Sequence, residues 1–279
     1  MGARSEVWPM RTPVTYLFVP ADRPERFAKA MGSGADRVIL DLEDAVRPEA
    51  KPAARAAIRA AALDWPRVVV RVNPATTEFI ADDLSAVAAT GAMAVMLPKA
   101  EEPREVARVR DAIGREIEVI PQIETALGLE RVDALLGAQG VRRVAFGHLD
   151  YALDLGCVPE WEALTLARQR LVWRSRLAGR DAPVDSVTPE LDPARVAEDT
   201  ARAKALGMGG KLLIHPAQVA PSAESFAPTE AELAWARRVL AAVAAGAGAI
   251  AVDGRMVDKP VEDAARRILD LSPNAQEHV

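Results

Sequence analysis

Five acidic residues follow short apolar runs along the chain: Asp41, Glu43, Asp44, Glu124 and Asp150. Carboxylates within a few ångströms of one another repel unless they are protonated or neutralised by a cation. A hard divalent cation such as Mg²⁺ would neutralise this repulsion. Mg²⁺ usually binds one or two protein carboxylates and keeps its remaining coordination positions for water and substrate oxygens. If the fold gathers these acids, the sequence indicates an oxygen-liganded divalent metal site.

Other catalytic templates find no support in the sequence. The three histidines, His148, His215 and His278, form no HxxxH or HxH pair, which argues against a zinc site of the histidine type. There is no GxGxxG after a strand, no GxxxxGK[ST] and no GxSxG. The run 207–211 resembles a phosphate loop only loosely, and we expect it to end a helix and lead into a strand.

Eight short apolar runs could be the strands that position these acids. Most of their positions are apolar, as in strands covered on both faces. The runs are Val14–Val19, Arg37–Asp41, Arg67–Val72, Ala94–Leu97, Glu118–Gln122, Arg142–Phe146, Val184–Val187 and Lys211–Ile214.

Segments with helical periodicity separate these runs, for example Lys51–Ala62 and Glu105–Arg115. Eight βα units over roughly 200 residues predict a (β/α)8 TIM barrel. The pattern then changes to helices around Glu230–Ala245 and from Pro260 onward. We therefore expect a barrel domain over residues 1–220 and a C-terminal helical segment, 221–279, acting as a lid or a subunit-swapped arm.

In a TIM barrel the catalytic groups come from the C-terminal ends of the strands and the loops that follow them. The five acids occupy such positions, with Arg71 and Lys99 among the other polar residues there. We expect Lys99 and His215 to be structural. Glu124 and Asp150 follow the fifth and sixth predicted strands, so adjacent loops can bring both carboxylates to one ion.

The composition limits the classes of partner. The chain has 279 residues, 50% of them hydrophobic, with a net charge of −5 and a pI near 5.4, which gives no electrostatic reason to expect nucleic acid or an anionic membrane. The single cysteine, Cys157, excludes an intramolecular disulfide. Neither a signal peptide nor an apolar run long enough to span a bilayer is evident, so we expect a cytoplasmic protein.

Each site candidate also has a structural explanation. Glu124 and Asp150 could be surface acids near helix N-termini, where the helix dipole favours negative charge. Glu43 or Asp44 could be the N-cap of the following helix. Arg71 could serve only as an ion-pair partner of those two acids. Asp258, in an exposed stretch, has the character of a turn residue.

From about Tyr16 to Leu269 the chain resembles the HpcH/HpaI aldolase and citrate lyase β-subunit superfamily, in particular its acyl-CoA lyase branch. Eight segments carry the resemblance in order: Leu17–Pro20 with Arg23–Phe27, Leu40–Val46, Val70–Pro74, Leu97–Glu101, Gln122–Ala126, Phe146–Asp150, Ile214–Pro216 and Asp253–Asp258.

The resemblance implies roles for individual residues. Glu124 and Asp150 match two metal-ligating carboxylates, and Arg71 matches an arginine at the α-keto acid end of the substrate. Glu43 and Asp44 match acids that hold the metal's waters and that arginine. Asp258 matches an acid/base residue supplied in trans by a neighbouring subunit.

The implied activity is Mg²⁺-dependent cleavage, with Mn²⁺ as a substitute, of a 3-hydroxyacyl-CoA thioester into an α-keto acid and an acyl-CoA. Substrates of the malyl-, methylmalyl-, citramalyl- and citryl-CoA type fit this chemistry, and the implied assembly is a homotrimer or a larger homo-oligomer. Arg23, Arg26 and Lys29, near the barrel mouth, are candidates for holding the phosphates of coenzyme A, although basic residues on a first helical turn are often only a solvated face.

Three alternatives remain on the same site. They are a malyl- or citramalyl-CoA thioesterase, a class II aldolase that uses no thioester, and a citrate lyase β subunit acting on an acyl carrier protein. His148 and Leu149 stand where many members of the superfamily have a small or acidic residue. This departure concerns the shape of the pocket, and hence the substrate, more than the metal.

Overall fold

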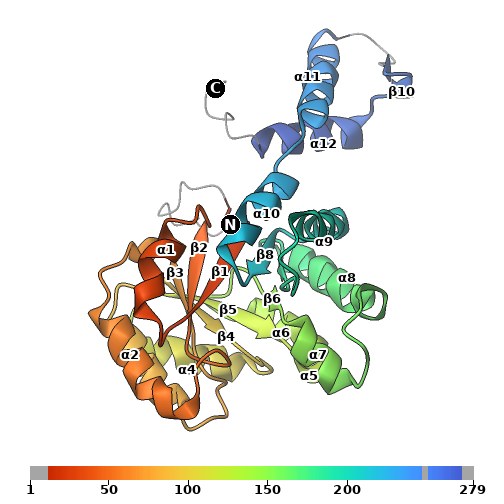
Figure 1. Ribbon diagram of the computed structural model, residues 1–279. Coiled ribbons are helices and arrows are strands. Elements are labelled where there is room, and N and C mark those ends of the chain that lie inside the picture. The colour runs from red at the N-terminus through yellow and green to blue at the C-terminus, as the bar shows by residue number, and fades with distance from the viewer. Residues whose placement is uncertain (1–11, 247–250, 272–279) are drawn as a thin grey trace. The chain divides into compact units, whose positions relative to one another are not determined.

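The computed structural model describes residues 12–246 and 251–271. They form two compact units that meet in sequence at Glu224 and Ser225. The first, from Pro13, is a closed barrel of eight parallel strands with helices around it (Figure 1). The TIM-barrel prediction is confirmed. No helix in the described ranges is long and apolar enough to cross a membrane.

The strands follow one another around the barrel in chain order, and β1 closes it by pairing with β8. They are β1 (Thr15–Pro20), β2 (Arg37–Asp41), β3 (Val68–Arg71), β4 (Ala94–Leu97), β5 (Glu118–Ile123), β6 (Ala145–Phe146), β7 (Val184–Asp185) and β8 (Gly210–Leu213). The sixth and seventh are shorter than the sequence predicted, because regular pairing is confined to two residues in each.

Helices connect the strands. In the barrel unit they are α1 (Phe27–Met31), α2 (Lys51–Ala60), α3 (Ile80–Ala88), α4 (Pro103–Ile113), α5 (Ala126–Glu130), α6 (Val132–Gly137), α7 (His148–Leu155), α8 (Trp161–Leu177) and α9 (Pro193–Leu206), and α10 (Val219–Phe226) follows β8. Short 3-10 turns are η1 (Pro24–Arg26), η2 (Pro48–Ala50), η3 (Trp65–Arg67) and η4 (Pro216–Gln218). Gly207, with φ 97°, ends α9 and leads toward β8, as the sequence predicted.

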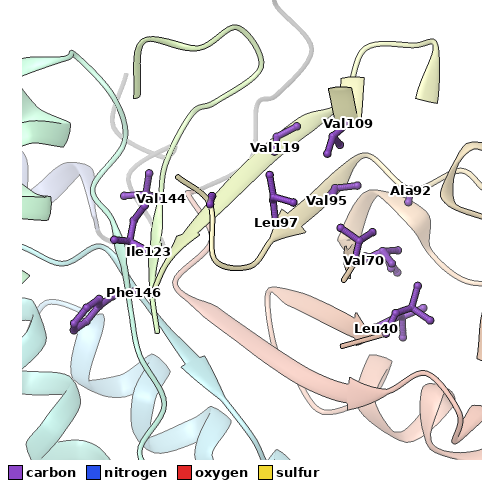
Figure 2. Packing of buried hydrophobic residues seen from close by; sticks show 14 of the residues in the cluster. Leu40, Val70, Ala92, Val95, Leu97, Val109, Val119, Ile123, Val144 and Phe146 are labelled. Carbon is purple, nitrogen blue, oxygen red and sulfur yellow. The ribbon is translucent and has the colours of Figure 1, made fainter. Parts of the chain in front are cut away.

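Side-chain alternation along the strands builds two apolar layers. One set of residues fills the barrel interior, among them Ile39, Val69 and Met96. Their strand neighbours point outward and pack against the helices, and Figure 2 shows Leu40, Val70 and Val95 of this outer cluster with others from neighbouring strands. The alternation fixes which residue at each strand end faces the barrel mouth.

The second unit contains α11 (Glu230–Ala244), α12 (Lys259–Asp270) and an antiparallel ribbon of β9 (Ala251–Val252) and β10 (Arg255–Met256). Its small core is centred on Ala236, Val239 and Ala265. The role of this segment as a lid or a swapped arm stays a prediction.

Candidate active site

Asp41 and Arg71 lie at the mouth because they end neighbouring strands in register. They come two residues after the interior-facing Ile39 and Val69, so their side chains point to the same side. Arg71 donates from Nε to Asp41 Oδ1 (2.8 Å) and from Nη2 to Oδ2 (2.7 Å). Burial opposes the charge on Arg71, but Asp41 outweighs it and holds the arginine pKa above its usual value. This arginine is therefore permanently charged and rigidly oriented.

Asp41 also shapes the loop that carries the next acids. Its two oxygens accept hydrogen bonds from the backbone N–H groups of Glu43 (2.9 Å) and Ala45 (3.3 Å). Glu43 is buried and places Oε2 at 3.0 Å from Arg71 Nη1. Asp44 is exposed and lines the mouth cavity, without a hydrogen bond or ion pair among the described residues. Arg71 thus pairs with Asp41 and Glu43, and not with Asp44.

Glu124 is 2% exposed and follows β5 with its carboxylate held between two backbone segments. Oε2 accepts the backbone N–H of Lys99 at 2.9 Å. Oε1 lies so close to the backbone of Gly147 that a Cβ atom there would stand 2.3 Å from it. Burial, and then the nearby charge of Glu43, raises the pKa of Glu124 to about 8. Backbone groups therefore hold the Glu124 carboxylate in place, and the nearby positive charges do not offset the effect of its burial on the pKa.

Lys99 brings positive charge to the acids. Its ammonium lies 2.9 Å from Glu43 Oε1, 3.3 Å from Asp150 Oδ1 and 3.9 Å from Glu124 Oε2. Asp150 is in the first turn of α7, with 35% of its side chain exposed. Burial opposes the charge on Lys99, but the hydrogen bond that its ammonium donates to Glu43, together with the other carboxylates, holds the lysine pKa above its usual value. The structure therefore gathers Glu43, Glu124 and Asp150 around one cationic group.

A cavity of about 390 Å³ lies at the barrel mouth. Asp41, Asp44, Arg71, Glu124 and Asp150 line it together with an apolar wall that includes Phe18, Val187 and Leu212. The Phe18 ring lies 4.6 Å from the Arg71 guanidinium carbon. A cavity with polar groups on one side and an apolar wall on the other suits a small anionic molecule with an apolar portion.

The donor set fits a hard divalent cation. Glu124 and Asp150 supply two carboxylates, and the described residues contain no cluster of three or more histidine, cysteine, aspartate or glutamate side chains able to hold a metal ion. Two protein carboxylates with open positions match Mg²⁺ better than a closed structural site. Burial first, and then the charge of Glu43, raises the pKa of Glu124, and a dication bound beside this carboxylate would act in the opposite direction.

His148 lies on the cavity wall next to Leu149. Its Nδ1 is 2.5 Å from Ser186 Oγ, and the same hydroxyl oxygen accepts the His148 backbone N–H at 3.0 Å. Burial, and then the charge of Arg168, lowers the His148 pKa to about 4, so the imidazole is neutral at pH 7. His148 is a fixed polar group in the wall of the cavity.

Behind that wall lies a buried ion cluster. Asp185 accepts from Arg168 Nε (2.7 Å) and lies 3.3 Å from Lys211 Nζ. Burial opposes ionisation of Asp185, but Lys211 and Arg168 outweigh it and hold the aspartate pKa below its ordinary value. The three charges tie β7 and β8 to α8.

The other predicted residues lie apart from this cluster. Arg23 is the N-cap of η1, Arg26 lies in η1 and Lys29 in α1; all three are exposed, and none of them lines the mouth cavity. Asp258 belongs to the C-terminal unit, where its side chain accepts the N–H of Val261 at 3.1 Å and caps α12. The roles predicted for these four residues stay predictions.

The sequence places Lys99 among the polar residues at the barrel mouth but predicts a structural role for it, and it gives Asp41 no role of its own. Lys99 immediately follows a Pro after a strand, which by itself is compatible with a structural lysine. The register of β2 with β3 makes Asp41 the principal partner of Arg71. That signal was present in the sequence, because both residues end their predicted strands.

Comparison with known proteins gives a consistent result. The sequence model of the HpcH/HpaI aldolase/citrate lyase family matches residues 15–216. A citrate lyase subunit beta-like protein of Mycobacterium tuberculosis is 39% identical over 262 residues, which cover 91% of this chain and 93% of that protein. Human mitochondrial citramalyl-CoA lyase is 29% identical over 292 residues, covering 94% of this chain and 86% of that enzyme.

Solved structures agree with the fold. The crystal structure of CitE from M. tuberculosis in complex with magnesium, acetoacetate and coenzyme A superposes with a TM-score of 0.85 at 37% identity, covering 93% of this chain and 98% of that one. A citrate lyase beta subunit from the same organism, complexed with oxaloacetate and magnesium, has a TM-score of 0.71 at 35% identity and covers 77% of this chain and 97% of that one.

Proposed function

Because this chain belongs to the HpcH/HpaI aldolase/citrate lyase family, we propose that it is an oxo-acid lyase that uses Mg²⁺ to cleave a 3-hydroxyacyl-CoA thioester into an α-keto acid and an acyl-CoA. The observation that carries the proposal is the convergence of Glu43, Glu124 and Asp150 on one point beside Arg71, at a cavity of about 390 Å³. Magnesium, coenzyme A and keto acids in the solved relatives support it.

In this proposal Glu124 and Asp150 hold the Mg²⁺ ion, and Mn²⁺ can replace it. When bound, the metal supplies Lewis acidity toward the oxygen that becomes the keto carbonyl. Glu43 and Asp44 would hold water molecules beside the metal. Glu124 is suited to this role because its position is fixed by the Lys99 N–H and by the absence of a side chain at Gly147.

Arg71 would act on the same oxygen. As the carbon–carbon bond breaks, the hydroxyl oxygen of the substrate gives its proton to water and passes through an anionic state before it becomes a carbonyl. A preoriented guanidinium stabilises such charge at little reorganisation cost. Asp41 and Glu43 fix the orientation of Arg71, and a guanidinium has more N–H groups than these contacts occupy.

The electron pair of the broken bond goes to the thioester fragment, which becomes an enolate. That carbon needs a proton, and a carboxylic acid positioned nearby can supply it and remove it in the condensing direction. We assign this role to Asp258, delivered within a homotrimer or larger homo-oligomer by the C-terminal segment 221–279. Exposed Arg23, Arg26 and Lys29 would hold the phosphates of coenzyme A.

The test is an assay of the purified full chain with Mg²⁺ and malyl-, methylmalyl-, citramalyl- or citryl-CoA. Keto acid and free thiol are measured in parallel, with chelator-treated protein as the control. We expect glyoxylate, pyruvate or oxaloacetate to form without free thiol, and only with the metal. Free thiol without keto acid would establish the thioesterase instead. Cleavage of a free hydroxy-keto acid would favour the class II aldolase, and activity only on a thioester of acyl carrier protein would favour the citrate lyase subunit.

A further inference from the structure

Lys99 holds an unusual backbone conformation. It follows β4 with φ 49°, and Asp253 is the other residue besides glycine with positive φ in the described ranges. Residues with a Cβ atom disfavour this region, and such strain persists only where the surroundings determine it. Here the conformation directs both the N–H and the side chain of Lys99 toward the acids, the N–H donating to Glu124 Oε2 at 2.9 Å.

The two proposed metal ligands depend on Lys99 for their contacts. Among the described residues, every hydrogen bond and ion pair of the Glu124 and Asp150 carboxylates goes to Lys99, namely the backbone bond to Glu124 and the contacts of Nζ at 3.9 Å and 3.3 Å. The ammonium thus faces the oxygens that a dication would need. Two cations sharing them would repel each other strongly, because the site is largely buried.

Lys99 also has an alternative partner. Its shortest contact is with Glu43 Oε1 at 2.9 Å, and Glu43 is not one of the proposed ligands. The lysine side chain is 34% exposed, whereas those of Glu43 and Glu124 are 5% and 2% exposed. The ammonium can therefore move toward solvent while keeping Glu43, whereas the buried carboxylates stay in place.

We propose that Lys99 is an exchangeable internal cation: in the metal-free protein its ammonium gathers Glu124 and Asp150, and binding of the divalent metal displaces it onto Glu43 and the solvent. The inference rests on the proposed function for the identity of the metal. Metal binding in this scheme replaces one positive group by another, so the ligands are assembled before the metal arrives. Lys99 is a positioning residue in this scheme.

The first test compares Mg²⁺ binding by calorimetry in wild-type protein and in Lys99→Met. Removal of the competing charge should tighten Mg²⁺ binding by about tenfold or more, given the size of a unit-charge interaction at roughly 4 Å. Lys99→Arg, which keeps the charge, should bind no more tightly than wild type. Lys259→Met, which removes a lysine of the C-terminal unit that is 68% exposed, is the control and should leave Mg²⁺ affinity unchanged.

The second test uses wild-type protein, so it does not depend on a variant that folds. Lysine labelling by reductive methylation is followed by peptide mass spectrometry, with Lys259 as the internal reference. We expect Lys99 to react slowly without Mg²⁺ and several-fold faster at saturating Mg²⁺.

Labelling of Lys99 that is unchanged or slowed by Mg²⁺ would overturn the exchange, as would Mg²⁺ affinity in Lys99→Met that is equal to or weaker than wild type. If Lys99→Met does not fold, the labelling decides. If wild-type protein binds no Mg²⁺ at all, the proposed function fails and the exchange fails with it, whereas Mg²⁺ binding with unaltered labelling defeats the exchange alone.

Discussion

The carboxylate of Glu124 lies against the backbone of Gly147, where a Cβ atom would stand 2.3 Å from Oε1 and 2.5 Å from Cγ. Gly147 is the N-cap of α7, whose first turn carries Asp150. One glycine therefore lets the two proposed ligands, which come from successive βα loops, approach the same point.

We predict that Gly147→Ala weakens Mg²⁺ binding and lowers turnover by roughly 10-fold to 100-fold. Substitutions of residues that hold metal ligands in position have effects of this size in other metal sites. The added methyl must push aside a buried side chain fixed on its other side by the Lys99 N–H. Calorimetry and the lyase assay measure the effect. Gly137→Ala is the matched control, because a Cβ at Gly137 meets nothing within 4 Å. Equal behaviour of the two variants would refute the role of Gly147.

Glu124→Gln and Asp150→Asn should each abolish metal-dependent turnover and weaken Mg²⁺ binding by roughly 100-fold or more, because each removes a charged ligand. The fold should persist, which circular dichroism can verify. Asp154→Asn serves as the control, since Asp154 lies in the same helix but accepts the backbone N–H of Ala126 outside the mouth cavity. Full Mg²⁺ affinity in either ligand variant would contradict the assignment.

The metal-free protein should lose stability as pH rises through the Glu124 transition. The folded-state pKa is raised from the ordinary value of 4.5 to about 8 by burial and by Glu43. Since the folded pKa is the higher one, the stabilising contribution is complete below 4.5 and is lost by about 8. Between these two pH values, the melting temperature should fall more steeply with rising pH for wild type than for Glu124→Gln. Saturating Mg²⁺ should reduce the difference between the two curves. Parallel curves without metal would argue against a raised pKa.

Asp185→Asn should destabilise the barrel by roughly 3–5 kcal/mol at neutral pH, because it leaves the buried charges of Arg168 and Lys211 without their carboxylate. The Asp185 pKa is lowered in the folded protein, so its contribution is present above the ordinary value of 3.8 and is lost as pH falls further. In urea unfolding, the difference in the free energy of unfolding between wild type and the variant should therefore become smaller at acidic pH. Asp133→Asn, which breaks an exposed pair with Arg174, should cost far less.

Asp258 can be tested with a pair of substitutions that separate its two roles. Asn is also a good N-cap, so Asp258→Asn should keep α12 and its stability while turnover falls by roughly 10²-fold to 10⁴-fold. Asp258→Ala should in addition lose about 1 kcal/mol of stability with the cap. Undiminished turnover in Asp258→Asn would remove this residue from the chemistry.

A separate experiment tests whether Asp258 acts in the active site of a neighbouring subunit. Subunits carrying Asp258→Asn and Glu124→Gln, each inactive alone, should regain part of the turnover when they are unfolded together and refolded as mixed oligomers. Recovery is expected because one mixed interface would combine an intact Glu124 with an intact Asp258. Complete lack of recovery, with mixed oligomers demonstrated, would place the acid on its own barrel.

The sequence allowed the barrel to be predicted because the strand signal is local. Predicted runs such as Arg37–Asp41 and Ala94–Leu97 coincide with β2 and β4, since apolar residues covered on both faces form an unbroken run. The predicted strand Arg142–Phe146 is longer than β6, because Val144 is a residue type typical of strands although ladder pairing begins only at Ala145. Local composition does not encode where pairing to a neighbour stops.

The site was predictable only in part, for a similar reason. Acids at strand ends can be recognised one at a time, and Glu43, Glu124 and Asp150 do come together. The partner of each acid depends on register and on backbone conformation. Lys99 reaches the acids because its φ is positive, a conformation that its residue type does not predict. Asp41 joins the site because strand register places it opposite Arg71.

The pairing of β1 with β8 has a consequence for biosynthesis. Thr15 pairs with Lys211, which lies 196 positions further along the chain. As the chain leaves the ribosome, one edge of β1 stays without its hydrogen-bond partner until β8 has emerged, and open strand edges are where nascent chains join wrong neighbours. Truncation before Gly210 would therefore leave β1 permanently without its β8 partner. The nascent chain should depend most on chaperones while translation is paused before β8 has left the ribosome.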